Sequence, residues 1–160
     1  KLLHTDDYFN GREGLAIHRD FYLDMYEALS QFKDYSVVGH FNIVDRYLYH
    51  IRPGLPLNPP AAEEWIRPLL NMIIADGKGL ELNTSSFRYN LPIYTPAREI
   101  LQLYKELGGT IVTIGSDAHR PNYIADHFKD GCQLLESIGF KYLCTFQAGK
   151  PTFHKISSLF

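Results

Sequence analysis

The sequence predicts an α/β fold in which parallel strands are joined by crossover helices. Two observations support this prediction. Helical and extended apolar patterns alternate along the chain, and each expected strand but the last is followed by a helix. Strands separated by crossover helices run parallel. The 160 residues suffice for one hydrophobic core, so we expect a single domain over residues 1–160.

The first half of the chain supplies two helices and a strand. Residues 18–32 carry apolar side chains at helical spacing, and residues 37–41 form a short β-branched run that is typical of a buried strand. A loop rich in Pro and Asn over residues 53–60 leads to a second helix over residues 61–77. That helix must tolerate Pro68 in its first turns.

The second half continues the alternation. Its expected elements are a strand over 78–84, a helix over 95–109, a strand over 110–117, a helix over 123–140 and a final strand over 140–146. We expect Thr95 to cap the helix that follows it, with Pro96 at its first position, and Gly139 to end the last helix. An open sheet and a closed barrel both fit this order. In either fold, active sites gather at the carboxyl ends of the strands.

Composition limits the possible partners and location. The formal net charge is -2, so the chain has no broad basic field for nucleic acid or an anionic membrane. No apolar run is long enough for a membrane helix, and we expect no signal peptide. Cys132 and Cys144 occupy positions where a small buried residue is expected. We therefore expect free thiols in a reducing compartment, the cytoplasm.

Three potential metal ligands fall at the predicted strand ends. His40 ends the first strand, and Asp117 and His119 follow the third in IGSDAHR. Alternation along an extended segment would point Asp117 and His119 the same way, toward one divalent metal or two neighbouring metals. Taken alone, an Asp-x-His segment is more often a helix cap followed by a surface histidine. Taken alone, His40 is more often a packing residue. The histidines outside strand ends are interpreted as surface or packing residues: His4, His18, His50, His127 and His154.

Two arginines and a glutamate lie near the same strand ends. Arg46 and Arg88 are expected in loops just beyond the first and second strands, and a guanidinium can hold phosphate with two parallel hydrogen bonds. From spacing alone, a surface salt bridge is the commoner role. Glu81 lies within the second strand, where a carboxylate often supports a ligand rather than binding the metal itself.

The segment GSDAHRP resembles the last metal motif of the polymerase-and-histidinol-phosphatase (PHP) family. Three further segments resemble its histidinol-phosphatase branch: VVGHFNIVDRY, LELNTSSFRY and GFKYLCTFQAGKPTF. These motifs occur in the family's order and extend over nearly the whole chain. The resemblance implies the later βα units of a distorted seven-stranded β/α barrel, similar to a TIM barrel.

The resemblance also implies an activity. His40, Asp117 and His119 would be ligands in a trinuclear centre of zinc, manganese or iron, and Arg46 and Arg88 would hold the substrate phosphate. The implied reaction is hydrolysis of L-histidinol phosphate to L-histidinol and phosphate in histidine biosynthesis. It would use a metal-activated hydroxide and a small-molecule substrate.

One departure from the family is large. Its N-terminal H-x-H motif and the ligands that follow it are absent, and the chain opens on Lys1 in a stretch that does not read as a natural start. Three functions stay open: part of a histidinol-phosphate phosphatase, a phosphoesterase for another small phosphate, or a non-catalytic remnant that folds with a partner chain.

Overall fold

The structure is a computed structural model that describes residues 6–159 of the chain. A three-stranded parallel sheet has the order β1-β2-β3, and β4 and β5 form a separate antiparallel hairpin. The strands are β1 (Val37–Val38), β2 (Gly79–Asn83), β3 (Val112–Gly115), β4 (Tyr142–Gln147) and β5 (Lys150–Lys155). The parallel pairing confirms the predicted α/β class.

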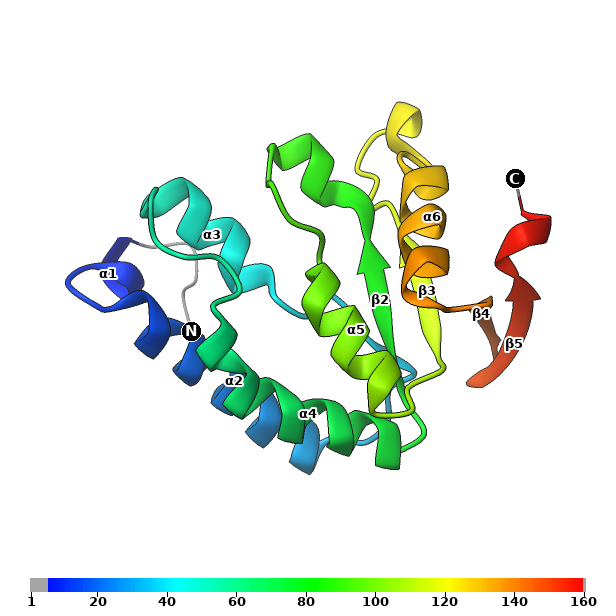
Figure 1. Ribbon diagram of the computed structural model, residues 1–160, viewed down its shortest axis with the longest axis horizontal. Coiled ribbons are helices and arrows are strands. Elements are labelled where there is room, and N and C mark those ends of the chain that lie inside the picture. The colour runs from blue at the N-terminus through cyan, green and yellow to red at the C-terminus, as the bar shows by residue number, and fades with distance from the viewer. Residues whose placement is uncertain (1–5, 160) are drawn as a thin grey trace.

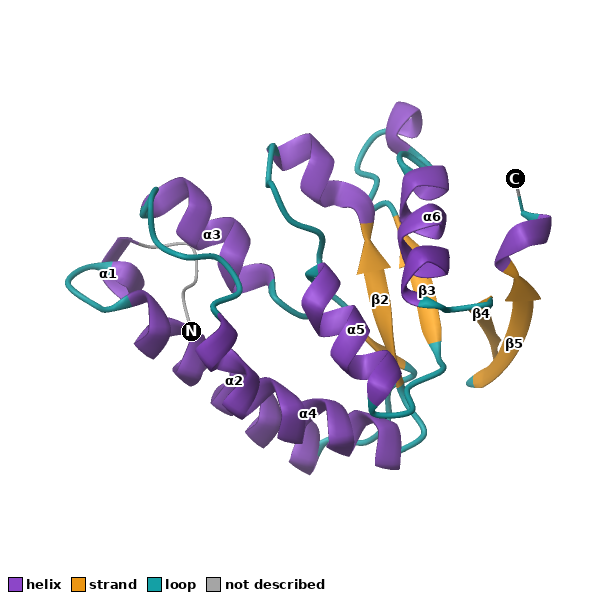
Figure 2. Cartoon of the chain, viewed as in Figure 1, coloured by secondary structure: helices purple, strands orange, loops and turns teal. Residues whose placement is uncertain are grey.

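Helices make up most of the remaining structure (Figure 2). The α-helices are α1 (Asp6–Phe9), α2 (Gly14–Gln31), α3 (Ile43–Ile51), α4 (Glu63–Ala75), α5 (Arg98–Glu106) and α6 (Phe128–Ile138). Four short 3-10 helices are η1 (Pro60–Ala62), η2 (Thr84–Tyr89), η3 (Pro121–Tyr123) and η4 (Ile156–Ser158). No helix within residues 6–159 is both long and apolar enough to cross a membrane.

The main core lies between the sheet and the helices. In Figure 1, α5 and α6 lie in front of β2 and β3, and α2 and α4 run side by side along the lower edge. Leu82 of β2 faces Gly131 of α6, where an added Cβ would come within 3.2 Å of its side chain. The absence of a side chain at Gly131 lets α6 approach the sheet closely. Because side chains alternate along a strand, Glu81 points to the opposite face and stays partly exposed.

A second, smaller apolar cluster holds α3. It consists of four fully buried side chains from α1, α2 and α3: Phe9, Ile17, Val44 and Leu48. Figure 1 shows α1 and α3 at the end of the molecule away from β3, α6 and the hairpin. The orientation of α3 therefore depends on a few neighbours of its own.

Several expected elements differ from the structure. The final strand, β4, lies antiparallel against β5 instead of joining the parallel sheet, because a two-residue turn at Ala148–Gly149 lets the chain fold back at once. Helix α5 begins at Arg98 with Ala97 as its N-cap, so the predicted capping by Thr95 is wrong. Gly139 ends α6 with a φ of 100°, as expected.

Other expectations also have clear outcomes. Cys132 and Cys144 are free and buried, which confirms the prediction for the thiols.

His18 is fully buried, His50 and His127 are exposed, and His4 lies outside the described residues. The predicted loop around Arg46 is wrong, because that segment is the helix α3.

Candidate functional site

The candidate site lies at the carboxyl ends of the parallel strands. In Figure 1, β2 and β3 point the same way, and the green turn η2 and the yellow segment after β3 lie together beyond them. Hydrogen bonds join these two segments, because Thr84 Oγ1 donates to the Asp126 carbonyl at 2.6 Å. Five of the residues assigned from sequence lie in or next to the ends of β1, β2 and β3 or in η2, which follows β2: His40, Glu81, Arg88, Asp117 and His119. Arg46 lies on α3 instead.

The first group contains His40, Glu81 and Asn83. Asn83 Nδ2 donates to Glu81 Oε2 at 3.3 Å and lies 3.5 Å from His40 Nδ1. The Glu81 carboxylate lies between two glycines on the neighbouring strand ends. A Cβ at Gly39 would lie 3.1 Å from Oε2, and a Cβ at Gly115 would overlap Oε1. Glycine at both positions therefore makes room for the carboxylate.

The second group is Asp117 and His119. The strand ends at Gly115, and Asp117 has a φ of 51°, so the extended alternation expected for this segment is wrong. The two side chains nevertheless remain neighbours, with His119 Nδ1 3.7 Å from Asp117 Oδ1. The His119 side chain is 80% exposed, and its Nδ1 lies 2.9 Å from the Asp117 carbonyl oxygen.

These two groups do not merge into one metal cluster. Over residues 6–159, the structure has no group of three or more His, Cys, Asp and Glu side chains close enough to hold one ion. It brings Asp117 and His119 together, and it places His40 with Asn83 and Glu81. Shared binding of one metal by His40, Asp117 and His119 stays a prediction.

Arg88 is anchored in the site. Its Nη2 donates to the Ser116 carbonyl at 2.5 Å and to the Asp117 carbonyl at 2.9 Å, so η2 is tied to the loop after β3. Nη1 lies 3.6 Å from Asp126, and the guanidinium stacks 4.8 Å from the Tyr123 ring centroid. Nη1 is buried yet has no hydrogen-bond partner among the described residues. A buried donor of this kind can bind an anion.

Arg46 has a different environment. It projects from α3, with its guanidinium carbon 4.3 Å from the Tyr89 ring centroid and 5.5 Å from that of Tyr47. Within the described part of the chain, no carboxylate forms a salt bridge with Arg46, so the surface salt-bridge interpretation fails there. The guanidinium is held on an aromatic face with its hydrogen-bond donors available.

Sequence reasoning assigned no role to Asn83, Tyr89 or Asp126, although Asn83 is among the polar residues at the second strand end. Asn83 and Tyr89 occur in the segment LELNTSSFRY, beside residues that were singled out. Their roles depend on contacts with distant positions, such as the stacking of Arg46 on Tyr89. No local pattern indicates such contacts.

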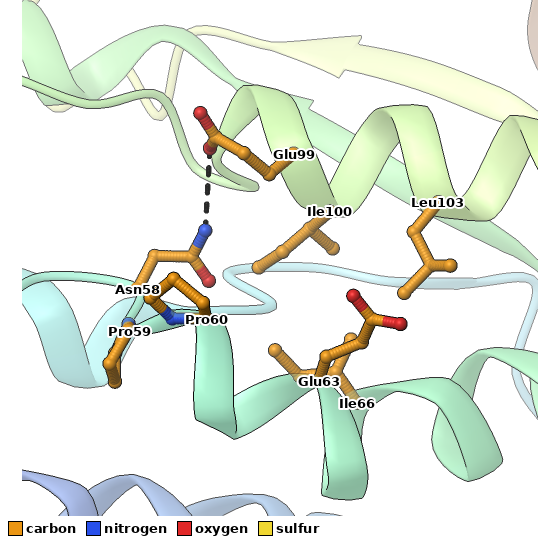
Figure 3. A pocket seen from close by; sticks show the side chains of 8 residues that line it. All are labelled: Asn58, Pro59, Pro60, Glu63, Ile66, Glu99, Ile100 and Leu103. Atoms are coloured by element: carbon orange, nitrogen blue, oxygen red, sulfur yellow. Dashed lines mark hydrogen bonds between the residues drawn. The ribbon is translucent and has the colours of Figure 1, made fainter.

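A well-formed cavity lies outside this site. It has a volume of about 170 Å³ and lies between the first turns of α4 and α5 (Figure 3). Its base is apolar, and the carboxylates of Glu63 and Glu99 lie at its rim, where Asn58 Nδ2 donates to Glu99 at 3.3 Å. Acidic groups in the first turn of a helix are favoured by the helix dipole, which accounts for both glutamates. None of the strand-end residues lines this cavity.

The fold and the site define a class of protein. It is an α/β protein with carboxylate, imidazole and guanidinium groups near the carboxyl ends of its parallel strands. Within this class, the chain is similar to histidinol-phosphatases. No family model matches it.

The sequence relatives share part of their length with the chain. It is 34% identical over 84 residues to a probable histidinol-phosphatase of Thermotoga maritima, covering 52% of this chain and 35% of that protein. It is 26% identical over 136 residues to the histidinol-phosphatase of Lactococcus lactis, covering 82% of this chain and 48% of the relative. The chain thus spans at most about half the length of these relatives.

A solved structure supports the fold. The histidinol phosphate phosphatase of Lactococcus lactis, in complex with zinc, L-histidinol and phosphate, superimposes with a TM-score of 0.69 at 22% identity. The match covers 91% of this chain and 54% of that one. The chain therefore has the fold of about half of that enzyme.

Proposed function

We propose that this chain provides the phosphate-binding rim and part of the metal site of a phosphomonoester hydrolase that acts on L-histidinol phosphate. The observation that carries the proposal is the anchoring of Arg88 on the Ser116 and Asp117 carbonyls, next to the neighbouring Asp117 and His119 side chains. Arg46 stacks on Tyr89, which follows Arg88 in η2. The similar Lactococcus lactis enzyme binds zinc, L-histidinol and phosphate, which supports this choice of substrate and metal.

The donor types fit a divalent metal. His40, Asp117 and His119 offer two imidazoles and a carboxylate, which are common zinc ligands, and iron or manganese accepts the same donors. Asn83 and Glu81 are placed to orient the His40 ring through the hydrogen bonds described above. A bound metal would supply Lewis-acid chemistry at the phosphate ester. A trinuclear centre would need ligands beyond these three.

The arginines act on the phosphate itself. The partly exposed Arg88 guanidinium and the stacked Arg46 guanidinium would each donate to phosphoryl oxygens. Negative charge builds on these oxygens during in-line displacement, so the two cations stabilise the transition state. Asp126, 3.6 Å from Arg88, orients the guanidinium.

The complete protein would be a TIM-like barrel of the PHP family, located in the cytoplasm and active in histidine biosynthesis. The chain would contribute the later βα units, and further polypeptide would close the sheet and complete the metal site. The small number of ligands among residues 6–159 supports this arrangement. It also favours a second candidate, a non-catalytic remnant that folds with a partner chain.

The test is kinetics and metal analysis on a complete enzyme carrying this segment. Arg46→Ala and Arg88→Ala should each remove a contact of roughly 1.5–3 kcal/mol, a tenfold to hundredfold fall in kcat/KM. Metal content should stay constant, because an arginine is not a ligand. Lys at either position should recover only part of the loss.

Two ligand variants serve as the comparison. Asp117→Ala and His119→Ala should lower metal content and activity together. Wild-type kinetics in both arginine variants would refute the phosphate assignment. The isolated 160-residue chain should bind metal weakly and turn over the substrate poorly or not at all, and efficient turnover would show that no further polypeptide is needed.

A further inference from the structure

The geometry points to Asp45 and His18 as a buried pair that positions Arg46. This inference rests on the proposed phosphate role of Arg46. Asp45 immediately precedes Arg46 on α3, and both side chains of the pair are completely buried at 0% exposure. The aspartate receives three donors, two from other segments and one from Asn42, the N-cap residue of α3. The histidine joins α3 to α2.

Every oxygen of Asp45 faces a donor. Oδ1 accepts from the His18 ring at Nε2 (2.7 Å) and from the Asn58 backbone N–H (2.9 Å). Oδ2 accepts from Asn42 Nδ2 at 2.8 Å. An isosteric Asp45→Asn change would turn an NH2 group toward at least one of these donors. These donors therefore require a carboxylate at position 45, and an amide of the same size does not replace it.

The histidine is equally constrained. His18 Nδ1 lies 2.8 Å from the Gly14 carbonyl oxygen, which can only accept, so this nitrogen carries a proton. Nε2 lies 2.7 Å from Asp45 Oδ1, so the ring is held at both nitrogens. A buried pair of this kind fixes geometry strongly, because removing one partner leaves the other buried without its hydrogen bond.

The pair controls the direction in which Arg46 projects. Helix α3 packs against the small cluster of Val44, Leu48 and their neighbours. The hydrogen bonds from His18 and the Asn58 backbone tie the first turn of α3 to α2 and to the loop before η1. Asn42, the N-cap residue of α3, holds the other carboxylate oxygen. They thereby set where Arg46 meets the Tyr89 ring.

Arg46 itself provides a spectroscopic readout. Its guanidinium lies 4.3 Å from the Tyr89 ring centroid, so the ring current shifts the NMR signal of its Nε–H group. In Asp45→Asn, measured in the 160-residue chain, this signal should move toward the position of a free arginine. Asp34→Asn, at an exposed position in the loop after α2, is the matched control and should leave the signal in place.

A milder variant guards against loss of folding. Asn42→Ala removes one donor to Asp45 and leaves the His18–Asp45 pair intact, and no side-chain cap of α3 is lost. It should shift the Arg46 signal in the same direction by a smaller amount. If Asp45→Asn does not fold, Asn42→Ala decides alone. A purely stabilising role would lower the melting temperature and leave the signal of the folded molecules unchanged, which would overturn the inference.

Titration with inorganic phosphate separates this inference from the proposed function. The affinity should fall about tenfold in a variant whose Arg46 signal has moved. If the signal moves and the phosphate affinity stays constant, the positioning stands and the phosphate role of Arg46 fails. If the signal stays in place in the folded variants, the positioning fails whatever the affinity.

Discussion

Arg88 and Arg46 should differ sharply in what they contribute to folding, although both are proposed to bind phosphate. Arg88→Ala removes two hydrogen bonds from a charged donor, to the Ser116 and Asp117 carbonyls. Bonds of this kind contribute roughly 1.5–3 kcal/mol each. Asp117 is partly exposed and its carbonyl regains some water, whereas Ser116 is buried, so we expect a loss of about 3 kcal/mol in the free energy of unfolding.

Arg46→Ala should cost much less. Its recorded contacts are the stacking arrangements with Tyr47 and Tyr89, and an exposed cation–π contact contributes about 0.5–1 kcal/mol. With a urea m-value of about 2 kcal/mol per M, the unfolding midpoint should fall by about 1.5 M for Arg88→Ala and by less than about 0.5 M for Arg46→Ala.

The assay is urea unfolding of the 160-residue chain followed by circular dichroism. Arg120→Ala, at an exposed position in the same loop region, is the control and should stay within about 0.5 kcal/mol of the wild type. Arg88→Lys should recover part of the loss, because it keeps the charge without the planar fork. Equal midpoints for Arg88→Ala and Arg46→Ala would refute the anchoring role of Arg88.

Two further predictions concern buried titratable groups. Burial raises the pKa of Tyr104 from 10.0 to about 12. The unfolded chain then loses its proton first, so stability is complete below pH 10 and falls by up to about 2–3 kcal/mol between pH 10 and 12. Unfolding curves over this range should show the drop, and Tyr104→Phe should reduce it. Burial likewise raises the pKa of the Cys132 and Cys144 thiols, so a thiol reagent at neutral pH should react slowly with native protein and rapidly in urea. Fast reaction without denaturant would contradict this burial.

The sequence predicted the elements that local patterns define. The runs that became β2 and β3 are short, partly apolar stretches bounded by helical segments, and runs of that length are too short for another crossover helix. Helix α3 was missed because nine residues after a two-residue strand leave little periodicity to recognise. The hairpin of β4 and β5 was missed because β4 follows a helix, as a parallel strand would.

The site was predictable in its residue types and only partly in its geometry. GSDAH indicated metal ligands, but the left-handed backbone at Asp117 depends on the turn that follows β3. A residue other than glycine rarely adopts this conformation without a tertiary reason, such as the two hydrogen bonds that Arg88 makes across this turn. The His18–Asp45 pair spans 27 positions in the sequence and has no local signature.

Arg46 and Arg88 stand on separately packed parts of the molecule. Arg46 rests on the small cluster around Val44 and Leu48, and Arg88 is tied to the strand end that leads out of the main core. The two guanidinium groups are therefore held by different sets of packing contacts. A change that repacks the apolar cluster under α3 would therefore move Arg46 relative to Arg88 without altering the sheet. If both groups bind one phosphate, as proposed, such a change would alter the size of anion that fits between them.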